Sequence, residues 1–286
     1  MSPDNTTGAV LITGASTGIG KATALRLHAA GRTVYATARR PDSLHELTNL
    51  GLHTLTLDVT DDASMQSAVA HIEEREGSVG ALINNAGYGL YGPVEQVAMS
   101  EVQRQFDTNF FGLARLTQLV LPGMRAAGHG RVINVSSMGG RASLPGGAYY
   151  HATKYAVEAF SGALRLELAQ FGLDVVVIEP GPVHTAWVDT ATSSTPTNPD
   201  PSTADPYSAF KTAVNDSFAA VHSGPAARLA STAEDIATVI TKAASARRPR
   251  TRYLINPVAK LFVTLNHLLP DRSYDAFVRA QYRLPR

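Results

Sequence analysis

The sequence predicts an α/β protein built on a doubly wound parallel sheet with helices on both faces. Short apolar runs alternate with amphipathic helical segments along most of the chain, the pattern of a parallel sheet with right-handed crossovers. A glycine-rich turn at 13–20 joins the first apolar run to the first helix. With 286 residues and 44% hydrophobic content, the chain is long enough for one large domain over 1–286.

Composition limits the classes of function. The formal charge of +1 gives no broad basic surface for nucleic acid, so we expect no nucleic-acid partner. There is no cysteine, and the nine histidines form no His-Glu-x-x-His motif, so we expect no metal site. Residues 1–8 lack the pattern of a signal peptide, and no apolar run approaches the ~18 residues of a spanning helix. We therefore expect a cytoplasmic protein with no transmembrane segment.

The first strand, turn and helix predict a dinucleotide site. A buried strand is expected at 9–12 and a helix from the glycine turn to about residue 30. Such a turn presents backbone N–H groups and a positive helix end to phosphate. Gly14 allows the sharp turn, Gly18 leaves room for a pyrophosphate, and Gly20 lets the helix approach the strand. The spacing is Gly-x-x-x-Gly-x-Gly, so a purely structural turn is the alternative.

The end of the second strand, expected at 33–37, favours NADP over NAD. An acidic residue at this place bonds the ribose 2′-hydroxyl in NAD sites, whereas an arginine accommodates a 2′-phosphate. Here Ala38 is followed by Arg39 and Arg40. NAD stays open as the second cofactor, and a solvated basic loop is the structural alternative.

Polar residues end or interrupt the middle elements. Asp58 either bonds an adenine amine or caps the turn before the next helix. The sequence Asn-Asn-Ala-Gly at 84–87 suits the floor of a crevice. Asn109 falls inside a helical pattern at 100–125 among aromatic residues, where its amide needs partners, and a structural asparagine is the alternative. Further strands are expected at 53–57, 81–83, 132–135, 173–178 and 253–255.

Tyr150 and Lys154 form a candidate proton-transfer pair. They are four residues apart in a helix expected at 149–170, so they share one face. A free phenol titrates near ~10, and a cation close to it favours phenolate and lowers that pKa. Tyr150 would then exchange a proton near neutral pH. An exposed tyrosine with a surface lysine is the alternative.

Composition changes at Ala186. The segment that follows is rich in Ser, Thr, Pro and Asp, and we interpret about 186–230 as a substrate lid containing a helix at 206–221. Trp187, the only tryptophan, is an apolar wall for substrate or a core residue. After a helix at 233–246, a C-terminal helical extension at about 257–286 seals the substrate end, packs against a partner subunit or touches a membrane surface.

The assembled motifs resemble the short-chain dehydrogenase/reductase family over roughly 8–256. They occur in family order: Thr-Gly-x-x-x-Gly-Ile-Gly at 13–20, Asn-Asn-Ala-Gly at 84–87, Asn109, Ser137 with Tyr150-x-x-x-Lys154, and Pro180-Gly181 with Thr185. The resemblance implies a Rossmann-type sheet of about seven strands and nicotinamide-dependent interconversion of an alcohol and a carbonyl. The longer C-terminal segment is similar to that of reductases acting on steroid- or retinoid-like substrates.

The resemblance also implies roles for individual residues. Ser137 bonds the substrate oxygen, Tyr150 is the general acid/base, Lys154 holds the nicotinamide ribose, and Asn109 positions a water next to Lys154. Substrate contacts are expected from Ser137, Tyr150, Leu144 and Trp187. Cofactor contacts are expected from Gly14, Ser16, Thr17, Gly18, Ile19, Gly20, Arg39, Arg40, Asp58, Val59, Asn85, Ala86, Gly87, Tyr150, Lys154, Pro180, Gly181, Val183 and Thr185.

The function that follows is an NADP(H)-dependent oxidoreductase acting on a medium-sized hydrophobic ketone or secondary alcohol. The alternative from another class is a nucleotide-binding redox sensor that regulates a partner without turnover. A nucleotide-sugar epimerase is a third hypothesis, against which the glycine spacing and the length both speak. By resemblance, the helices near 100–125 and 149–170 are the faces of a homodimer or homotetramer.

Overall fold

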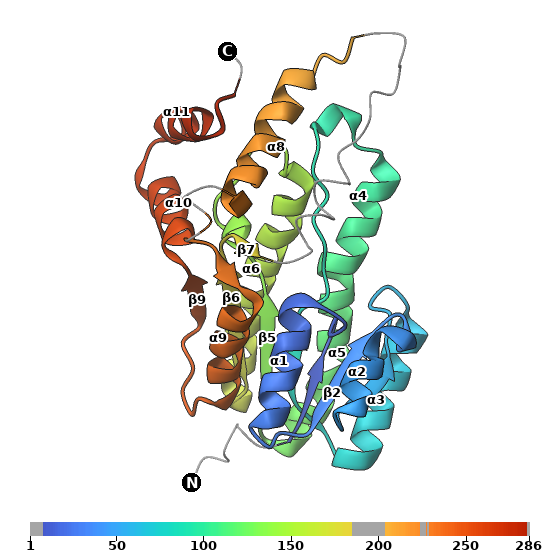
Figure 1. Ribbon diagram of the computed structural model, residues 1–286. Coiled ribbons are helices and arrows are strands. Elements are labelled where there is room, and N and C mark those ends of the chain that lie inside the picture. The colour runs from blue at the N-terminus through green and yellow to red at the C-terminus, as the bar shows by residue number, and fades with distance from the viewer. Residues whose placement is uncertain (1–7, 185–203, 224–226, 228, 285–286) are drawn as a thin grey trace.

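The computed structural model describes residues 8–184, 204–223, 227 and 229–284, and its centre is a seven-stranded parallel sheet (Figure 1). The strand order is β3-β2-β1-β4-β5-β6-β9, with every neighbouring pair parallel. This confirms the predicted doubly wound, Rossmann-type sheet. The strands are β1 (Ala9–Ile12), β2 (Val34–Ala38), β3 (His53–Thr56), β4 (Val79–Asn84), β5 (Arg131–Val135), β6 (Asp174–Pro180) and β9 (Arg252–Ile255).

Two helical layers bury the two faces of the sheet. The first consists of α1 (Gly18–Ala29), α2 (His45–Asn49) and α9 (Ala233–Ser245), and its apolar side chains pack on Val10 and Ile12 of β1. The second consists of α3 (Asp62–Glu76), α5 (Gly112–Ala127) and α6 (Ala148–Leu168), which pack on Leu11 of the same strand. Alternate residues of β1 therefore face opposite layers, as a strand covered on both sides requires.

Further helices stand beyond the carboxyl ends of the strands, where Figure 1 shows them at the top of the molecule. They are α4 (Met99–Phe106), α8 (Ser208–Ser223), α10 (Pro257–Leu268) and α11 (Asp271–Tyr282). The last two pack with Met138 and Leu144 in a separate apolar cluster. Ligands of open α/β sheets bind at this edge, so these helices enclose the place where a site is expected.

Several local features were not predicted from the sequence. The helical pattern at 100–125 contains a π-helical turn, η3 (Asp107–Phe111), between α4 and α5. A 3-10 turn, η1 (Pro41–Leu44), leads into the short α2 after Arg40. The strands β7 (Val183–His184) and β8 (Ser231–Thr232) form a second, two-stranded parallel sheet. Within the described ranges, no helix has both the length and the apolar character needed to cross a bilayer.

Candidate active site

The glycine turn after β1 is shaped by close backbone contacts. A Cβ built on Gly20 would lie 2.3 Å from the Gly14 carbonyl oxygen and 2.5 Å from Asn85 Nδ2. Asn85 Nδ2 donates to the carbonyls of Thr13 and Gly14 at 3.0 and 3.1 Å, which ties the turn to the end of β4. Only glycine fits at position 20, and the turn presents the N-terminus of α1 to the crevice, where a phosphate binds well.

One large cavity, of about 1420 Å³, runs from this turn across the carboxyl ends of the strands. Most of the predicted site residues line it: Gly14, Ser16, Thr17, Gly18, Ile19, Arg39, Arg40, Asp58, Val59, Asn85, Ala86, Gly87, Ser137, Leu144, Tyr150, Lys154, Pro180, Gly181 and Val183. Gly20 and Asn109 lie behind the lining, both buried. Thr185 and Trp187, and the lid residues 186–203, fall outside the described residues.

At one end of the cavity, two exposed arginines follow β2. Arg39 and Arg40 come directly after Ala38 and line the same part of the cavity as the glycine turn and Asp58. The Asp58 carboxylate accepts hydrogen bonds from the Thr60 N–H at 2.9 Å and the Thr60 hydroxyl at 2.8 Å. The structure shows the capped turn through Asp58 Oδ1, and the contact with an adenine amine stays a prediction.

Asn109 is held in the π-helical turn η3, a rare geometry that often accompanies functional sites. Its Nδ2 donates to the Tyr88 carbonyl at 2.9 Å and to Thr153 Oγ1 at 3.2 Å, and its Oδ1 accepts from the Tyr88 N–H at 3.0 Å. Thr153 in turn donates to the Tyr150 carbonyl at 2.7 Å. The amide thus has the partners that its burial requires, and it links the Gly87 loop to α6.

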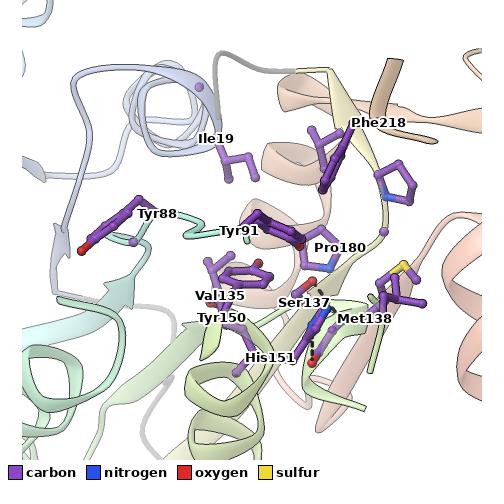
Figure 2. Close-up of a pocket in the computed structure, with 18 of the residues that line it drawn as sticks. Ile19, Tyr88, Tyr91, Val135, Ser137, Met138, Tyr150, His151, Pro180 and Phe218 are labelled. Carbon is purple, nitrogen blue, oxygen red and sulfur yellow. Dashed lines mark hydrogen bonds between the residues drawn. The ribbon is translucent and has the colours of Figure 1, made fainter. Parts of the chain in front are cut away.

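Ser137 and Tyr150 face each other across the cavity wall, between the end of β5 and α6 (Figure 2). Ser137 Oγ accepts a hydrogen bond from the Gly139 N–H at 3.0 Å, and the hydroxyl interacts with the Tyr150 phenol. The adjacent serine and tyrosine, Ser136 and Tyr149, do not face each other in this way. Ser136 Oγ is buried without a hydrogen-bond partner, and Tyr149 donates instead to the Val94 carbonyl at 3.3 Å. The structure therefore brings together the serine and tyrosine that the motif spacing selects.

Lys154 completes this wall of the cavity. Its ammonium donates to the Val135 carbonyl at 2.9 Å and lies 5.8 Å from the centre of the Tyr150 ring. Burial lowers the pKa of Lys154 to about 8, against the opposing attraction of Glu158. The lysine is thus turned inward toward the crevice, and the alternative of a surface lysine is excluded.

The prediction that Lys154 lowers the pKa of Tyr150 is wrong for the structure. Burial raises the pKa of Tyr150 to about 12, and the hydrogen bond with Ser137 only partly offsets this. The physical reason is desolvation: removing water from a phenolate costs more than the hydrogen bond with Ser137 returns. Tyr150 is therefore a protonated phenol at neutral pH, which makes it a proton donor.

The loop after β6 closes the opposite side of the cavity through Pro180, Gly181 and Val183. A Cβ on Gly181 would lie 2.4 Å from Asn256 Oδ1, so the loop packs directly on this side chain. Asn256 Nδ2 donates to the Pro182 carbonyl at 3.2 Å, and Asn256 Oδ1 accepts from the Ala259 N–H at 2.9 Å. The same residue thus fixes the loop and caps α10, a role that the sequence did not suggest.

The far part of the cavity, which we call the apolar end, is formed by Tyr91, Met138, Leu144, Phe218 and Phe262. The Tyr91 ring lies 5.8 Å from Tyr150 and makes an edge contact with Phe218 at 4.8 Å (Figure 2). Of these five, sequence reasoning identified only Leu144. Tyr91 follows the Asn-Asn-Ala-Gly motif by four residues, which is the one signal that could have found it.

His151 is buried next to Tyr150 and also lines the cavity. Its Nδ1 lies 3.1 Å from the Gly139 carbonyl, and its Nε2 is buried without a hydrogen-bond partner. Burial lowers the pKa of His151 to about 4, so the ring is neutral at physiological pH. It therefore adds a neutral polar group beside the apolar end.

The described residues contain no cluster of acidic and histidine side chains suited to a metal ion.

Comparisons with known proteins agree with this geometry. The sequence matches the family described as short chain dehydrogenase over residues 8–196. A probable short-chain type dehydrogenase/reductase, VdlC of Helicobacter pylori, is 34% identical, and the alignment covers 94% of this chain and 96% of that protein. The NADPH-dependent 3-dehydrocapnine reductase of Ornithobacterium rhinotracheale is 32% identical over 93% of this chain and 94% of its own.

A solved structure gives the same answer as the sequence comparisons. A short-chain dehydrogenase from Streptomyces avermitilis superimposes with a TM-score of 0.78 at 32% identity, and the match covers 96% of both chains. On fold, motif order and overall similarity, the chain belongs to the short-chain dehydrogenase/reductase family of oxidoreductases.

Proposed function

We propose that this protein is an NADP(H)-dependent reductase that interconverts a carbonyl and a secondary alcohol on a medium-sized hydrophobic substrate. The family binds a nicotinamide cofactor. The observation that carries the finer proposal is the layout of the cavity. It holds a glycine turn and two arginines at one end, an apolar end at the other, and Ser137, Tyr150 and Lys154 between them.

The chain's own residues fit the cofactor. The glycine turn at Gly18 and the N–H groups at the start of α1 line the cavity and suit a pyrophosphate, while Arg39 suits a 2′-phosphate. Pro180, Gly181 and Val183 are the candidates for the nicotinamide end, opposite Lys154. When bound, the cofactor supplies the hydride. The relative named as NADPH-dependent supports the choice of NADP over NAD.

In this proposal Tyr150 donates its proton to the substrate oxygen. Ser137 holds that oxygen through a second hydrogen bond, so the phenol and the carbonyl are aligned before the proton moves. The raised pKa of Tyr150, about 12, keeps the phenol protonated, which is the form that reduction of a carbonyl requires at the start. Lys154 contributes positive charge beside the phenolate left behind, and Asn109 holds the backbone of α6 through Thr153.

The apolar end supports a substrate whose carbonyl carries an apolar body. Tyr91, Phe218 and Phe262 present aromatic surface. Polar side chains of α8 and α11, among them Asp216, Ser217 and Gln281, line the same cavity. The segment around 186–230, which contributes Phe218 through α8, is proposed as the lid, and the extension formed by α10 and α11 as the far wall. Such a pocket orients an apolar substrate by burying its body, while the hydrogen bonds are made to the reacting oxygen.

Replacing Tyr150 by Phe tests the proton donor. Turnover of hydrophobic ketones with NADPH, followed by absorbance, should fall by about 10²–10⁴-fold, the usual contribution of a positioned acid. Tyr149→Phe is the matched control, because it removes a neighbouring phenol that bonds to Val94 instead of facing Ser137. Unchanged turnover in Tyr150→Phe would overturn the proposal. Tight NADPH binding without turnover of any ketone would favour a regulatory nucleotide sensor.

Replacing Arg39 by Asp tests the cofactor. NADPH affinity should fall by about tenfold or more, since a charge-assisted phosphate contact is lost, while NADH affinity should change little. Arg26→Asp makes the same change in net charge at an exposed position of α1 that does not line the cavity. Equal losses for NADPH and NADH in Arg39→Asp, or equal effects of the two variants, would remove the proposed role of Arg39.

Self-association is proposed from the outer faces of η3 and α6. Phe111 and Leu166 are large apolar side chains with 50% and 74% of their surface exposed there. Burying them in a homodimer or homotetramer would remove this apolar area from water. Light scattering of the purified protein gives the subunit number, and a monomer at micromolar concentration would contradict this part of the proposal.

A further inference from the structure

Four charged side chains meet beneath the cavity floor, on the side of β6 and β9 that faces α6. Arg252 Nε donates to Glu158 Oε2 at 3.1 Å and lies 3.2 Å from Glu179 Oε1, at ion-pair distance but without hydrogen-bond geometry. Arg141 Nη1 donates to Glu179 Oε2 at 3.4 Å. Glu179 is fully buried and Glu158 is 8% exposed. We call these four residues the charge cluster.

Each member of the charge cluster comes from a different segment. Glu158 lies one helical turn after Lys154 on α6, Arg141 follows Ser137 by four residues, and Glu179 directly precedes Pro180. Arg252 comes from β9, the edge strand, and pairs in register with Val177 of β6. The three segments that carry proposed active-site groups are thus joined through one set of side chains.

The cost of this arrangement argues for a role. Removing the Glu158 and Glu179 carboxylates from water is expensive, and the side chains of Arg141 and Arg252, still 38% and 34% exposed, only partly offset that cost. An apolar core of the same volume is often at least as stable. The cluster is incompletely satisfied, because Glu158 Oε1 and Glu179 Oε1 have no hydrogen-bond partner. Fold stability alone therefore does not explain it, and its position next to Lys154 suggests that its charges act on the site.

We propose that Glu158 and Arg252 are positioning residues for Lys154, and that the charge cluster they form with Arg141 and Glu179 holds the Ser137, Lys154 and Pro180 segments in one arrangement. This inference rests on the proposed function. Glu158 sets a negative charge one turn from the ammonium, and Arg252 fixes and partly neutralises that charge. The pair therefore tunes how readily Lys154 keeps its proton.

The electrostatics agree in direction with this assignment. The charge of Glu158 raises the pKa of Lys154, against the larger lowering by burial. Burial and the neighbouring Glu158 raise the pKa of Glu179 to about 7, while Arg141 and Arg252 lower it. The titratable and charged groups around Lys154 are Tyr150, His151 and Glu158 on α6. They also include the other three members of the charge cluster, from the segment after Ser137, from β6 and from β9.

The test measures the pKa of the Lys154 ammonium by NMR of ¹³Cε-labelled lysine. The chain has five lysines, Lys21, Lys154, Lys211, Lys242 and Lys260, and Lys154→Met assigns the signal. Glu158→Gln removes the negative charge and should lower the pKa of Lys154 by about one unit. Arg252→Gln removes the positive charge and should raise it. Opposite shifts from two variants that break the same ion pair are not expected from a merely structural role.

Asp174→Asn is the matched control. It breaks a different, part-buried ion pair, with Arg131, at the amino-terminal end of β6, far from Lys154 along the strands. The pKa of Lys154 should stay unchanged in this variant. Shifts of the same sign in Glu158→Gln and Arg252→Gln, no shift in either, or an equal shift in the control would overturn the inference. If Glu158→Gln does not fold, the sign of the shift in Arg252→Gln decides alone.

Turnover provides the second readout. The limb of the kcat/KM pH profile that reports Lys154 should move to lower pH in Glu158→Gln and to higher pH in Arg252→Gln, with KM for ketone little changed. The two proposals fail separately. A wild-type protein that reduces no ketone contradicts the proposed function while the NMR titration still tests the charge cluster. If the wild-type protein is active but neither substitution changes the pKa of Lys154, only the proposed role of the charge cluster is contradicted.

Discussion

Gly20→Ala is the sharpest single-atom perturbation of the proposed cofactor site. The added Cβ would lie 2.3 Å from the Gly14 carbonyl oxygen and 2.5 Å from Asn85 Nδ2, far inside ordinary contact distance. Neither neighbour can yield easily. The Gly14 carbonyl is backbone, and the Asn85 amide is held by hydrogen bonds to Thr13 and Gly14. The turn between β1 and α1 must therefore shift.

The magnitude follows from what the shift breaks. Displacing Asn85 loses two hydrogen bonds, each contributing about 1 kcal/mol. Forcing a methyl group into a packed site adds about 1–3 kcal/mol. We therefore expect the free energy of unfolding to fall by about 3–5 kcal/mol. Because the displaced N–H groups are those that would meet the cofactor phosphates, NADPH affinity should fall by at least about tenfold.

Two measurements on two variants check this. Urea unfolding gives the loss of stability, and the quenching of protein fluorescence by NADPH gives the dissociation constant. Gly162→Ala is the control, since Gly162 lies inside α6 with no heavy atom within 4 Å of the added Cβ. That variant should gain about 0.5–1 kcal/mol, as alanine is the better helix former. Wild-type NADPH affinity and stability in Gly20→Ala would refute the packing argument.

Two further predictions concern the protein as a whole. Burial lowers the pKa of His151 from 6.5 to about 4, so between these pH values the unfolded chain binds a proton that the folded chain does not. The contribution of His151 to the free energy of unfolding is therefore complete above pH 6.5 and should fall by about 3 kcal/mol toward pH 4. His151→Gln should flatten that part of the urea-midpoint profile, and an unaltered slope contradicts the assignment. Asp174→Asn should cost about 3 kcal/mol, because it leaves the buried Arg131 with only the backbone carbonyls at the end of α9.

Sequence reasoning succeeded where the signal is local. The strands, the glycine turn and the spacing that separates Ser137 from Ser136 and Tyr150 from Tyr149 depend on a few neighbouring residues. Both serines line the cavity, but only Ser137 interacts with the Tyr150 phenol, while Tyr149 turns to Val94. The position of Arg39 at the cavity was predicted for the same reason, because the end of β2 is evident from the residues of the strand itself.

Sequence reasoning failed where distant segments meet. The acidity of Tyr150 depends on how much water Tyr91 and its neighbour Phe218 exclude, and these come from a loop and from α8. Asn256, which braces the Gly181 loop, lies in a tight turn whose contacts no local pattern reports. The ion pairs of Arg252 join residues 73 and 94 positions apart, where the sequence shows only separate charges.

Strand β9 is synthesised after the other six strands of the central sheet, and it carries Arg252. A nascent chain that ends before this residue already contains Glu158 and Glu179, which must then approach each other with only Arg141 as a counter-ion. Synthesis of β9 and neutralisation of these two carboxylates therefore coincide. A chain that stops before Arg252 should yield not a weakened enzyme but a product destined for degradation.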